Sequence, residues 1–238
     1  MTAEQVPLLF DFKAEQSFTS FYAGRNYEAV KHLTDSSSGE GEQQLYLWSE
    51  TGLGKTHLLQ ACCQQAYQLQ HSSFYICLEK DQLPPPDILQ GLESFELVCI
   101  DNIEQCAGNS EWEHALFNFY NSHRDNGHKL ILTADVSPSF LPIVLPDLKT
   151  RMSWGLTLKL QEPDDTERIA AFTCKAKYLG FEVPPQVGAF LTKHYARDLP
   201  SLWNLLPKLD QATLVAKRKL TLPFLKQILA QQEHESNS

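Results

Sequence analysis

Short apolar runs alternate with longer segments of helical periodicity over the first two thirds of the sequence. Between the runs, apolar residues recur at helical spacing in about 55–69 and 110–124, and the polar segment 36–42 is expected to be a loop. This alternation predicts an α/β fold with a mainly parallel five-stranded sheet between layers of helices. The expected strands are 45–48, 74–78, 97–100, 130–133 and 156–160.

The pattern changes at Pro163, after which only helical periodicity remains. Asp164 and Glu167 form a capping-box pattern at the start of the first helix, and Pro207 should kink the third. The helices are expected at about 164–180, 185–195, 200–218 and 221–231. The sequence thus predicts a tail at 1–16, an α/β domain at 17–161 and a small all-α domain at 162–238.

Composition narrows the class of protein. The formal net charge is −9, so the phosphate backbone of DNA should repel the chain unless its basic residues gather on one face. The densest basic cluster, 217–219, ends a predicted helix, where cations favour the helix dipole. A nucleic-acid contact is the alternative for this cluster.

Cysteine usage and hydropathy point to a reducing compartment. The six cysteines include no CxxC pair, and we interpret them as reduced, mostly buried thiols rather than metal ligands. The N-terminal sequence lacks a basic leader, and no apolar run approaches the ~18 residues of a membrane span. We therefore expect a cytoplasmic protein with no membrane contact.

The segment Ser49–Thr56 nearly matches the phosphate-binding loop pattern G-x-x-x-x-G-K-[ST]. Gly54, Lys55 and Thr56 occupy its last three fixed positions, whereas Ser49 stands where the first glycine is usual. The loop leaves a predicted strand and opens a predicted helix, so its N–H groups should face phosphates. Lys55 is expected to neutralise the β- and γ-phosphates, and the Thr56 hydroxyl to ligate Mg²⁺. An ordinary glycine-rich turn is the alternative.

A second candidate element is LVCIDNIE, residues 97–104. Asp101 ends an apolar strand and is expected to hold Mg²⁺, directly or through water. The alternative is a plain buried strand with a terminal aspartate. Asn102 stands where many ATPases carry a second acid that orients the attacking water, and an amide is a weak substitute. His57, beside the loop, is interpreted as a structural helix residue rather than a catalyst.

Four ordered motifs, GLGKTHLL, LVCIDNIE, LILTADVSP and LKTRMSWGLT, resemble the AAA+ domain of the bacterial replication initiator DnaA. FTSFYAGRNYEAV resembles the segment that precedes the phosphate loop of that domain. The resemblance covers residues 17 to about 230. DnaA continues into a helix-turn-helix DNA-binding domain, before which this sequence stops. It therefore looks like the Hda family of DnaA-related regulators, which inactivate the initiator.

The resemblance implies a role for each matching position. Asp135 matches the first sensor, near the γ-phosphate, and Arg151 matches the arginine finger that acts on a neighbouring subunit's nucleotide. The alternative for Arg151 is an ordinary surface arginine. Pro200 aligns with the second-sensor arginine of the initiator. The expected nucleotide contacts are Gly24, Arg25 and Asn26 near the base, then Thr51, Gly52, Leu53, Gly54, Lys55, Thr56 and His57.

The family also carries a short motif that binds the DNA polymerase sliding clamp, and QVPLLF, residues 5–10, looks like one. Gln5, Leu8 and Phe10 are its expected contact residues. The implied protein holds ADP or another nucleoside diphosphate with Mg²⁺, and its partners are DnaA and the clamp. The resemblance leaves homo-oligomerisation open, and it implies no direct sequence-specific DNA binding.

Asn102 and Pro200 argue against efficient hydrolysis of the protein's own nucleotide. A helicase loader of the same superfamily is the runner-up, but it would hydrolyse ATP itself and usually needs a larger N-terminal domain. A P-loop kinase of small substrates is a third reading, for which the terminal helices offer no motif. Steady-state ATP turnover separates these functions, because the regulator should show almost none.

Overall fold

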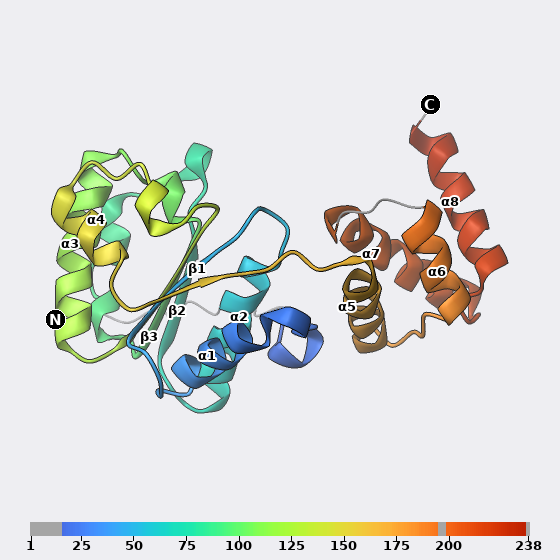
Figure 1. The fold of residues 1–238 in the computed structure, drawn as a ribbon, viewed down its shortest axis with the longest axis horizontal. Coiled ribbons are helices and arrows are strands. Elements are labelled where there is room, and N and C mark those ends of the chain that lie inside the picture. Colours follow the sequence, from blue (N-terminus) through green and yellow to red (C-terminus); the bar gives the residue numbers. More distant parts are fainter. Residues whose placement is uncertain (1–15, 195–198, 237–238) are drawn as a thin grey trace, which may run out of the picture.

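A five-stranded parallel sheet forms the centre of the larger domain (Figure 1). The computed structural model describes residues 16–194 and 199–236. The strand order is β2-β3-β4-β1-β5, and every neighbouring pair is parallel. The strands are β1 (Gln44–Trp48), β2 (Ser73–Cys77), β3 (Leu97–Asp101), β4 (Lys129–Ala134) and β5 (Leu156–Lys159). The predicted α/β sheet is confirmed.

Helices cover both faces of this sheet, as Figure 1 shows. Alternate strand residues point to opposite faces, so Leu45 and Leu47 pack in one cluster and Tyr46 in the other. The strands read as continuous apolar runs because both faces are buried. One face is covered by α1 (Tyr27–Ser37) and α2 (Lys55–Gln68), the other by α3 (Ser110–Asp125) and α4 (Pro146–Met152).

The C-terminal helices form a second domain with its own core. They are α5 (Asp165–Tyr178), α6 (Pro185–His194), α7 (Leu199–Ala216) and α8 (Leu222–Ser236). Buried side chains such as Phe172, Leu191 and Leu209 pack together between them. The predicted capping box is confirmed, because Asp164 Oδ1 accepts from the Glu167 N–H at 3.0 Å and Glu167 Oε2 from the Asp164 N–H at 3.2 Å.

The predicted loop at 36–42 begins too early, because Ser36 and Ser37 belong to helix α1. Both serines are buried. The Ser37 hydroxyl donates to the Thr34 carbonyl at 3.0 Å, so a polar side chain satisfies the end of the helix locally. The apolar face of α1 is also short, with Ala29 and Leu33 as its buried apolar residues, which left little periodicity to detect.

The segment before α1 fastens the α/β domain to the helical domain. Asn26 Oδ1 accepts from the Gln161 N–H at 2.7 Å, and Asn26 Nδ2 donates to the Gln161 carbonyl at 3.1 Å. The Arg25 guanidinium pairs with Asp164 at 2.7 Å and with Glu167 at 2.5 Å. Because these two acids begin α5, Arg25 ties the first turn of the helical domain to the sheet domain.

Two expectations drawn from composition also meet the structure. All six cysteines are free, and Cys62, Cys63, Cys99 and Cys106 are buried, which confirms mostly buried thiols. Within residues 16–194 and 199–236, none of the helices combines the length and apolar character needed to cross a membrane.

We predict that His123 makes stability depend on pH. Burial and the neighbouring His128 lower the pKa of His123 from 6.5 to about 4. Between these values the unfolded state binds more protons, so the free energy of unfolding falls as pH drops, by roughly 1 kcal/mol per pH unit. His123→Gln keeps a donor for the Phe95 carbonyl, which lies 3.2 Å from His123 Nε2. Urea unfolding at about pH 7.5 and about pH 5 should show a smaller loss in the variant than in the wild type. Equal losses would contradict the lowered pKa.

Candidate functional site

A cavity of about 680 Å³ lies at the carboxyl ends of the central strands, with walls from both domains. Parallel sheets place ligands at this edge, and the volume is typical of a small-molecule site. The segment 51–57 forms one wall and Gly24, Arg25 and Asn26 another. All ten positions that the resemblance assigned to nucleotide contact therefore line one cavity.

The loop between β1 and α2 has the backbone of a phosphate-binding loop. Gly52 and Gly54 adopt φ values of 90° and 98°, a region that favours glycine. A Cβ on Gly54 would also lie 2.8 Å from the Phe21 ring. Ser49 fits at the loop entry because it directly follows β1 and extends its pairing with β4: it is fully buried, and its N–H donates to the Ala134 carbonyl at 3.2 Å. A serine there leaves the loop intact.

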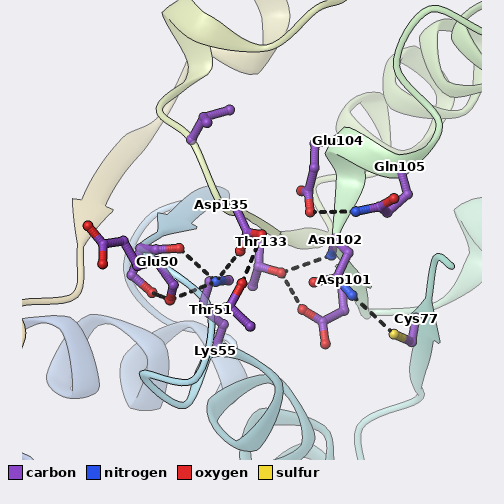
Figure 2. Close-up of polar contacts among 12 residues, drawn as sticks. Glu50, Thr51, Lys55, Cys77, Asp101, Asn102, Glu104, Gln105, Thr133 and Asp135 are labelled. Atoms are coloured by element: carbon purple, nitrogen blue, oxygen red, sulfur yellow. Dashed lines mark hydrogen bonds and ion pairs between the residues drawn. The ribbon is translucent and has the colours of Figure 1, made fainter. Parts of the chain in front are cut away.

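Lys55 begins α2 and is 6% exposed. Figure 2 shows its ammonium group held by oxygens from two strand ends. Lys55 Nζ lies 2.7 Å from the Ser49 carbonyl, 3.3 Å from the Glu50 carbonyl and 2.7 Å from Asp135 Oδ1. Buried ammonium groups need such partners, and these place the positive charge at the N-terminus of a helix beside the cavity.

Asp135, the expected sensor, lies beside the loop. Besides Lys55, its carboxylate accepts from the Thr51 hydroxyl at 3.1 Å. The side chain is 41% exposed and lines the cavity. Two motifs that are far apart in the sequence, the loop and the segment after β4, are thus joined through one carboxylate.

Asp101 is placed differently from the other predicted residues. It ends β3 but is fully buried and does not line the cavity. Its carboxylate accepts from the Tyr75 hydroxyl at 3.0 Å and from the Thr133 hydroxyl. Burial, with the charge of Asp101, raises the pKa of Tyr75, so this hydroxyl remains a donor. Both carboxylate oxygens are therefore engaged, and Figure 2 shows the contact with Thr133.

Asn102 adopts a left-handed conformation with φ of 60° and lines the cavity. Asparagine is one of the few residues that tolerate this region. Its backbone N–H donates to the Thr133 hydroxyl at 3.1 Å, and its amide nitrogen lies 3.4 Å from Cys77 Sγ. Thr133 therefore links Asp101 and Asn102 across β3 and β4, an arrangement that the sequence alone did not reveal.

His57 lines the cavity, but its ring is occupied by structural contacts. Nε2 lies 2.9 Å from the Ser17 carbonyl, and the ring packs against Phe21 at 5.4 Å between centroids. Burial lowers the pKa of His57 to about 4, so the ring is neutral at physiological pH. The structural interpretation made from the sequence fits this environment.

Sequence reasoning missed several residues of the cavity wall. Glu104 lines the cavity beside Asn102, and burial raises its pKa. Among the described residues, Glu104 Oε2 is buried without a hydrogen-bond partner. The helical domain contributes Lys175 from α5 and an apolar group from α7. The positions of the helical domain carry no motif, because they meet the cavity only through the packing of the two domains, whereas Glu104 ends the LVCIDNIE segment and was given no role. The α7 group is Trp203, Leu206 and Pro207.

Arg151 lies outside this cavity. It belongs to the last turn of α4, which Figure 1 places at the end of the sheet domain away from the helical domain. Its guanidinium stacks on aromatic rings of α3 and of the turn after α4. It makes no ion pair with any carboxylate within residues 16–194 and 199–236.

The family of this chain follows from comparison with known proteins. The family model of the bacterial DnaA ATPase domain matches residues 12–83 and 87–159. The chain belongs to the bacterial DnaA ATPase family. The lid domain of Hda matches residues 165–229. Together these matches make it an Hda-like, DnaA-related protein with an AAA+ nucleotide-binding domain, and the helical domain is its lid.

Solved structures share this fold. Domain III of Thermotoga maritima DnaA is 21% identical, with a TM-score of 0.75 over 92% of this chain and 97% of that chain. The AMPPCP-bound DnaA of Aquifex aeolicus is 21% identical, with a TM-score of 0.63 over 78% of this chain and 60% of that chain. The Thermotoga maritima RuvB branch migration motor is 16% identical, with a TM-score of 0.65 over 90% and 71%. At these identities the likeness establishes the fold.

We predict that Lys55→Ala weakens binding of a nucleoside diphosphate by about 1.5–3 kcal/mol, the scale of a charged hydrogen bond. Isothermal calorimetry measures the affinity, and the melting temperature checks that the variant folds. Lys177→Ala is the matched control, since Lys177 is exposed on α5 and does not line the cavity. Unchanged affinity in a folded Lys55→Ala variant would remove the phosphate-loop assignment.

Proposed function

We propose that this protein is a negative regulator of replication initiation that stimulates hydrolysis of ATP bound to the initiator DnaA. One observation carries the proposal. Arg151 lies away from the chain's own nucleotide cavity, without a carboxylate partner in the described part of the chain. This position supports a role at a nucleotide that another subunit holds, because Arg151 does not line the chain's own cavity.

Nucleotide binding by this chain is proposed to favour ADP with Mg²⁺. The loop N–H groups, Lys55 and the N-terminus of α2 would bind the phosphates. Mg²⁺ would neutralise phosphate charge, with Thr56 as a direct ligand. Asp101 does not fit direct ligation, because both of its carboxylate oxygens already accept hydrogen bonds and the side chain is fully buried. Contact through water, the other arrangement that the sequence allowed, would require an Asp101 oxygen to turn towards the cavity, which Asp101 does not line.

We propose that the chain hydrolyses its own nucleotide poorly. Asn102 cannot take a proton from an attacking water, and its left-handed backbone directs the amide towards Cys77. Pro200, at the start of α7, offers no charge where the initiator has its second sensor. The bound nucleotide would instead keep the lid in place, because Arg25 lines the cavity and pairs with Asp164 and Glu167 of the lid, and Asn26 lines the cavity and holds Gln161, the residue before the lid.

In the proposed reaction, Arg151 enters the nucleotide site of the initiator. Charge builds on the phosphoryl group as it is transferred, and a guanidinium beside its oxygens stabilises that charge. The partner supplies the ATP, the attacking water and the remaining phosphate contacts. In this mechanism the chain needs a fixed arginine and a stable fold, but it does not need to hydrolyse the nucleotide in its own cavity.

The clamp-binding segment and the domain limits complete the proposal. Gln5, Leu8 and Phe10 lie outside the described residues. We propose that they bind the sliding clamp as part of a tail over 1–16, followed by the α/β domain at 17–161 and the lid at 162–238. Docking on DNA-loaded clamp would bring Arg151 to the initiator without direct sequence-specific DNA binding.

We predict that Arg151→Ala folds, binds nucleotide and binds clamp as the wild type does, but fails to accelerate hydrolysis. An arginine supplied in trans increases the rate of phosphoryl transfer by a factor of roughly 10³–10⁵. Release of labelled phosphate from ATP-bound initiator, with DNA-loaded clamp and the variant, measures the effect. Stimulation at the wild-type level would disprove the finger assignment.

A second variant tests the tail. Pro7 favours an extended backbone at Val6, which lets Leu8 and Phe10 enter an apolar groove while Gln5 hydrogen-bonds at its rim. We predict that Gln5→Ala with Phe10→Ala abolishes clamp binding in surface plasmon resonance and leaves the melting temperature nearly unchanged. If the melting temperature falls strongly, the tail packs on its own domain instead.

A further inference from the structure

We propose that Trp154, together with Phe117 and Tyr120, positions Arg151 for entry into the partner's nucleotide site. The three rings form an aromatic cradle that holds the guanidinium at the outer end of α4. This inference rests on the proposed role of Arg151 in trans, and it assigns to Trp154 a positioning function rather than a catalytic one.

The cradle is defined by three contacts of one guanidinium. The Arg151 Cζ atom lies 4.7 Å from the ring centroid of Phe117, 5.1 Å from that of Trp154 and 5.4 Å from that of Tyr120. All three lie within the ~6 Å over which a cation is attracted to an aromatic face. Tyr120 and Trp154 also pack edge to face, at 6.2 Å between centroids. The rings therefore support one another as well as the arginine.

An aromatic cradle suits a group that must bind phosphate elsewhere. A carboxylate would occupy the N–H donors of Arg151, whereas stacking on rings uses its charge and its planar face. Within the part of the chain that the structure describes, Arg151 makes no ion pair. The donors are thus kept for a ligand while the side chain gives up much of its rotational freedom beforehand, which lowers the entropy cost of the productive geometry.

The backbone beneath the arginine is fastened at both ends of α4. At the end, Gln44 Nε2 donates to the Arg151 carbonyl at 3.1 Å. At the start, the buried Glu113 carboxylate accepts from the N–H groups of Val144 at 3.0 Å and Leu145 at 2.7 Å. Leu145 is the N-cap residue of α4. Since Glu113 belongs to α3, the same helix holds the start of α4 and carries two of the three rings, Phe117 and Tyr120.

The turn after the arginine fixes Trp154. Gly155 adopts φ of 74°, and a Cβ there would lie 2.3 Å from the Gln44 carbonyl oxygen, so no other residue fits without displacing β1. The ring of Trp154 also carries the guanidinium of Arg124, 4.3 Å from its centroid. Two arginines from separate elements therefore share one indole, which limits where that indole can lie.

Trp154 is the member of the cradle that can be changed with least damage. Its side chain is 38% exposed and it belongs to none of the buried clusters, whereas Tyr120 is 4% exposed and lies in the sheet core. Trp154→Leu removes the aromatic face and keeps an apolar side chain. Trp154→Phe restores a ring. Tyr178→Leu is the matched control, because Tyr178 is 42% exposed and lies beneath the cation of Lys175 on the lid.

The test measures labelled-phosphate release from ATP-bound initiator on DNA-loaded clamp over a range of concentrations of each variant. We expect Trp154→Leu to lower the maximal rate about tenfold, because small misplacements of a catalytic group cost one to two orders of magnitude in rate. The half-saturating concentration should change less than about threefold. Trp154→Phe should recover most of the rate, and Tyr178→Leu should match the wild type. A maximal rate within about twofold of wild type for Trp154→Leu, or a loss confined to the half-saturating concentration, overturns the inference.

Arg151→Ala separates failure of this inference from failure of the proposed function. If Arg151→Ala stimulates hydrolysis as the wild type does, the trans-finger function is wrong, and positioning by Trp154 falls with it. If only Arg151→Ala loses stimulation, the finger stands and the cradle is wrong. The double variant Arg151→Ala with Trp154→Leu should be no slower than Arg151→Ala, and an additive loss would mean that Trp154 contacts the partner itself.

A spectroscopic measurement tests the cradle without any partner. Ring currents from the three aromatic side chains should displace the Arg151 side-chain proton resonances upfield in the isolated protein. Trp154→Leu should remove part of this displacement and Trp154→Phe should restore it. Resonances of Arg151 at positions usual for a solvated arginine in the wild type would overturn the inference, whatever the hydrolysis rates are.

Discussion

Burial of the parallel sheet on both faces is the constraint on which the rest of this structure depends. With helices covering both faces, polar chemistry is restricted to the ends of the strands. The loop after β1, Asp101 at the end of β3 and Asp135 after β4 therefore share one edge. The buried ammonium of Lys55 joins two of these strand ends, because its partners are the carbonyls after β1 and the carboxylate after β4.

The lid meets this edge through a small set of polar contacts. Arg25 pairs with two acids at the start of α5, and Asn26 exchanges two hydrogen bonds with Gln161, the residue just before the lid. Exposed ion pairs of this kind contribute little stability individually. Their value lies in position, because Arg25 and Asn26 also line the cavity. A ligand that contacts them would therefore be coupled to the angle between the two domains, whether or not it is hydrolysed.

Much of this arrangement was predictable from the sequence, and the reasons are local. Each strand begins within one residue of its expected start, because apolar runs bounded by polar residues are strong signals. The loop and its context predicted the cavity wall at 51–57. Helix α1 was missed because its buried face includes serines. Lys175 and Trp203 were missed because the packing of the lid on the core, which no short pattern encodes, brings them to the cavity.

The surroundings of the charged residues were the least predictable part. From the sequence, Asp101 and Arg151 are single letters in motifs, and the motifs do not say what surrounds them. The structure surrounds Asp101 with two hydroxyl donors and Arg151 with three rings. The first environment satisfies a charge and withdraws it from the cavity, and the second leaves hydrogen-bond donors unused at the surface. The proposed function needs both, since it requires Asp101 to be restrained at one end of the core and a guanidinium to be presented at the other.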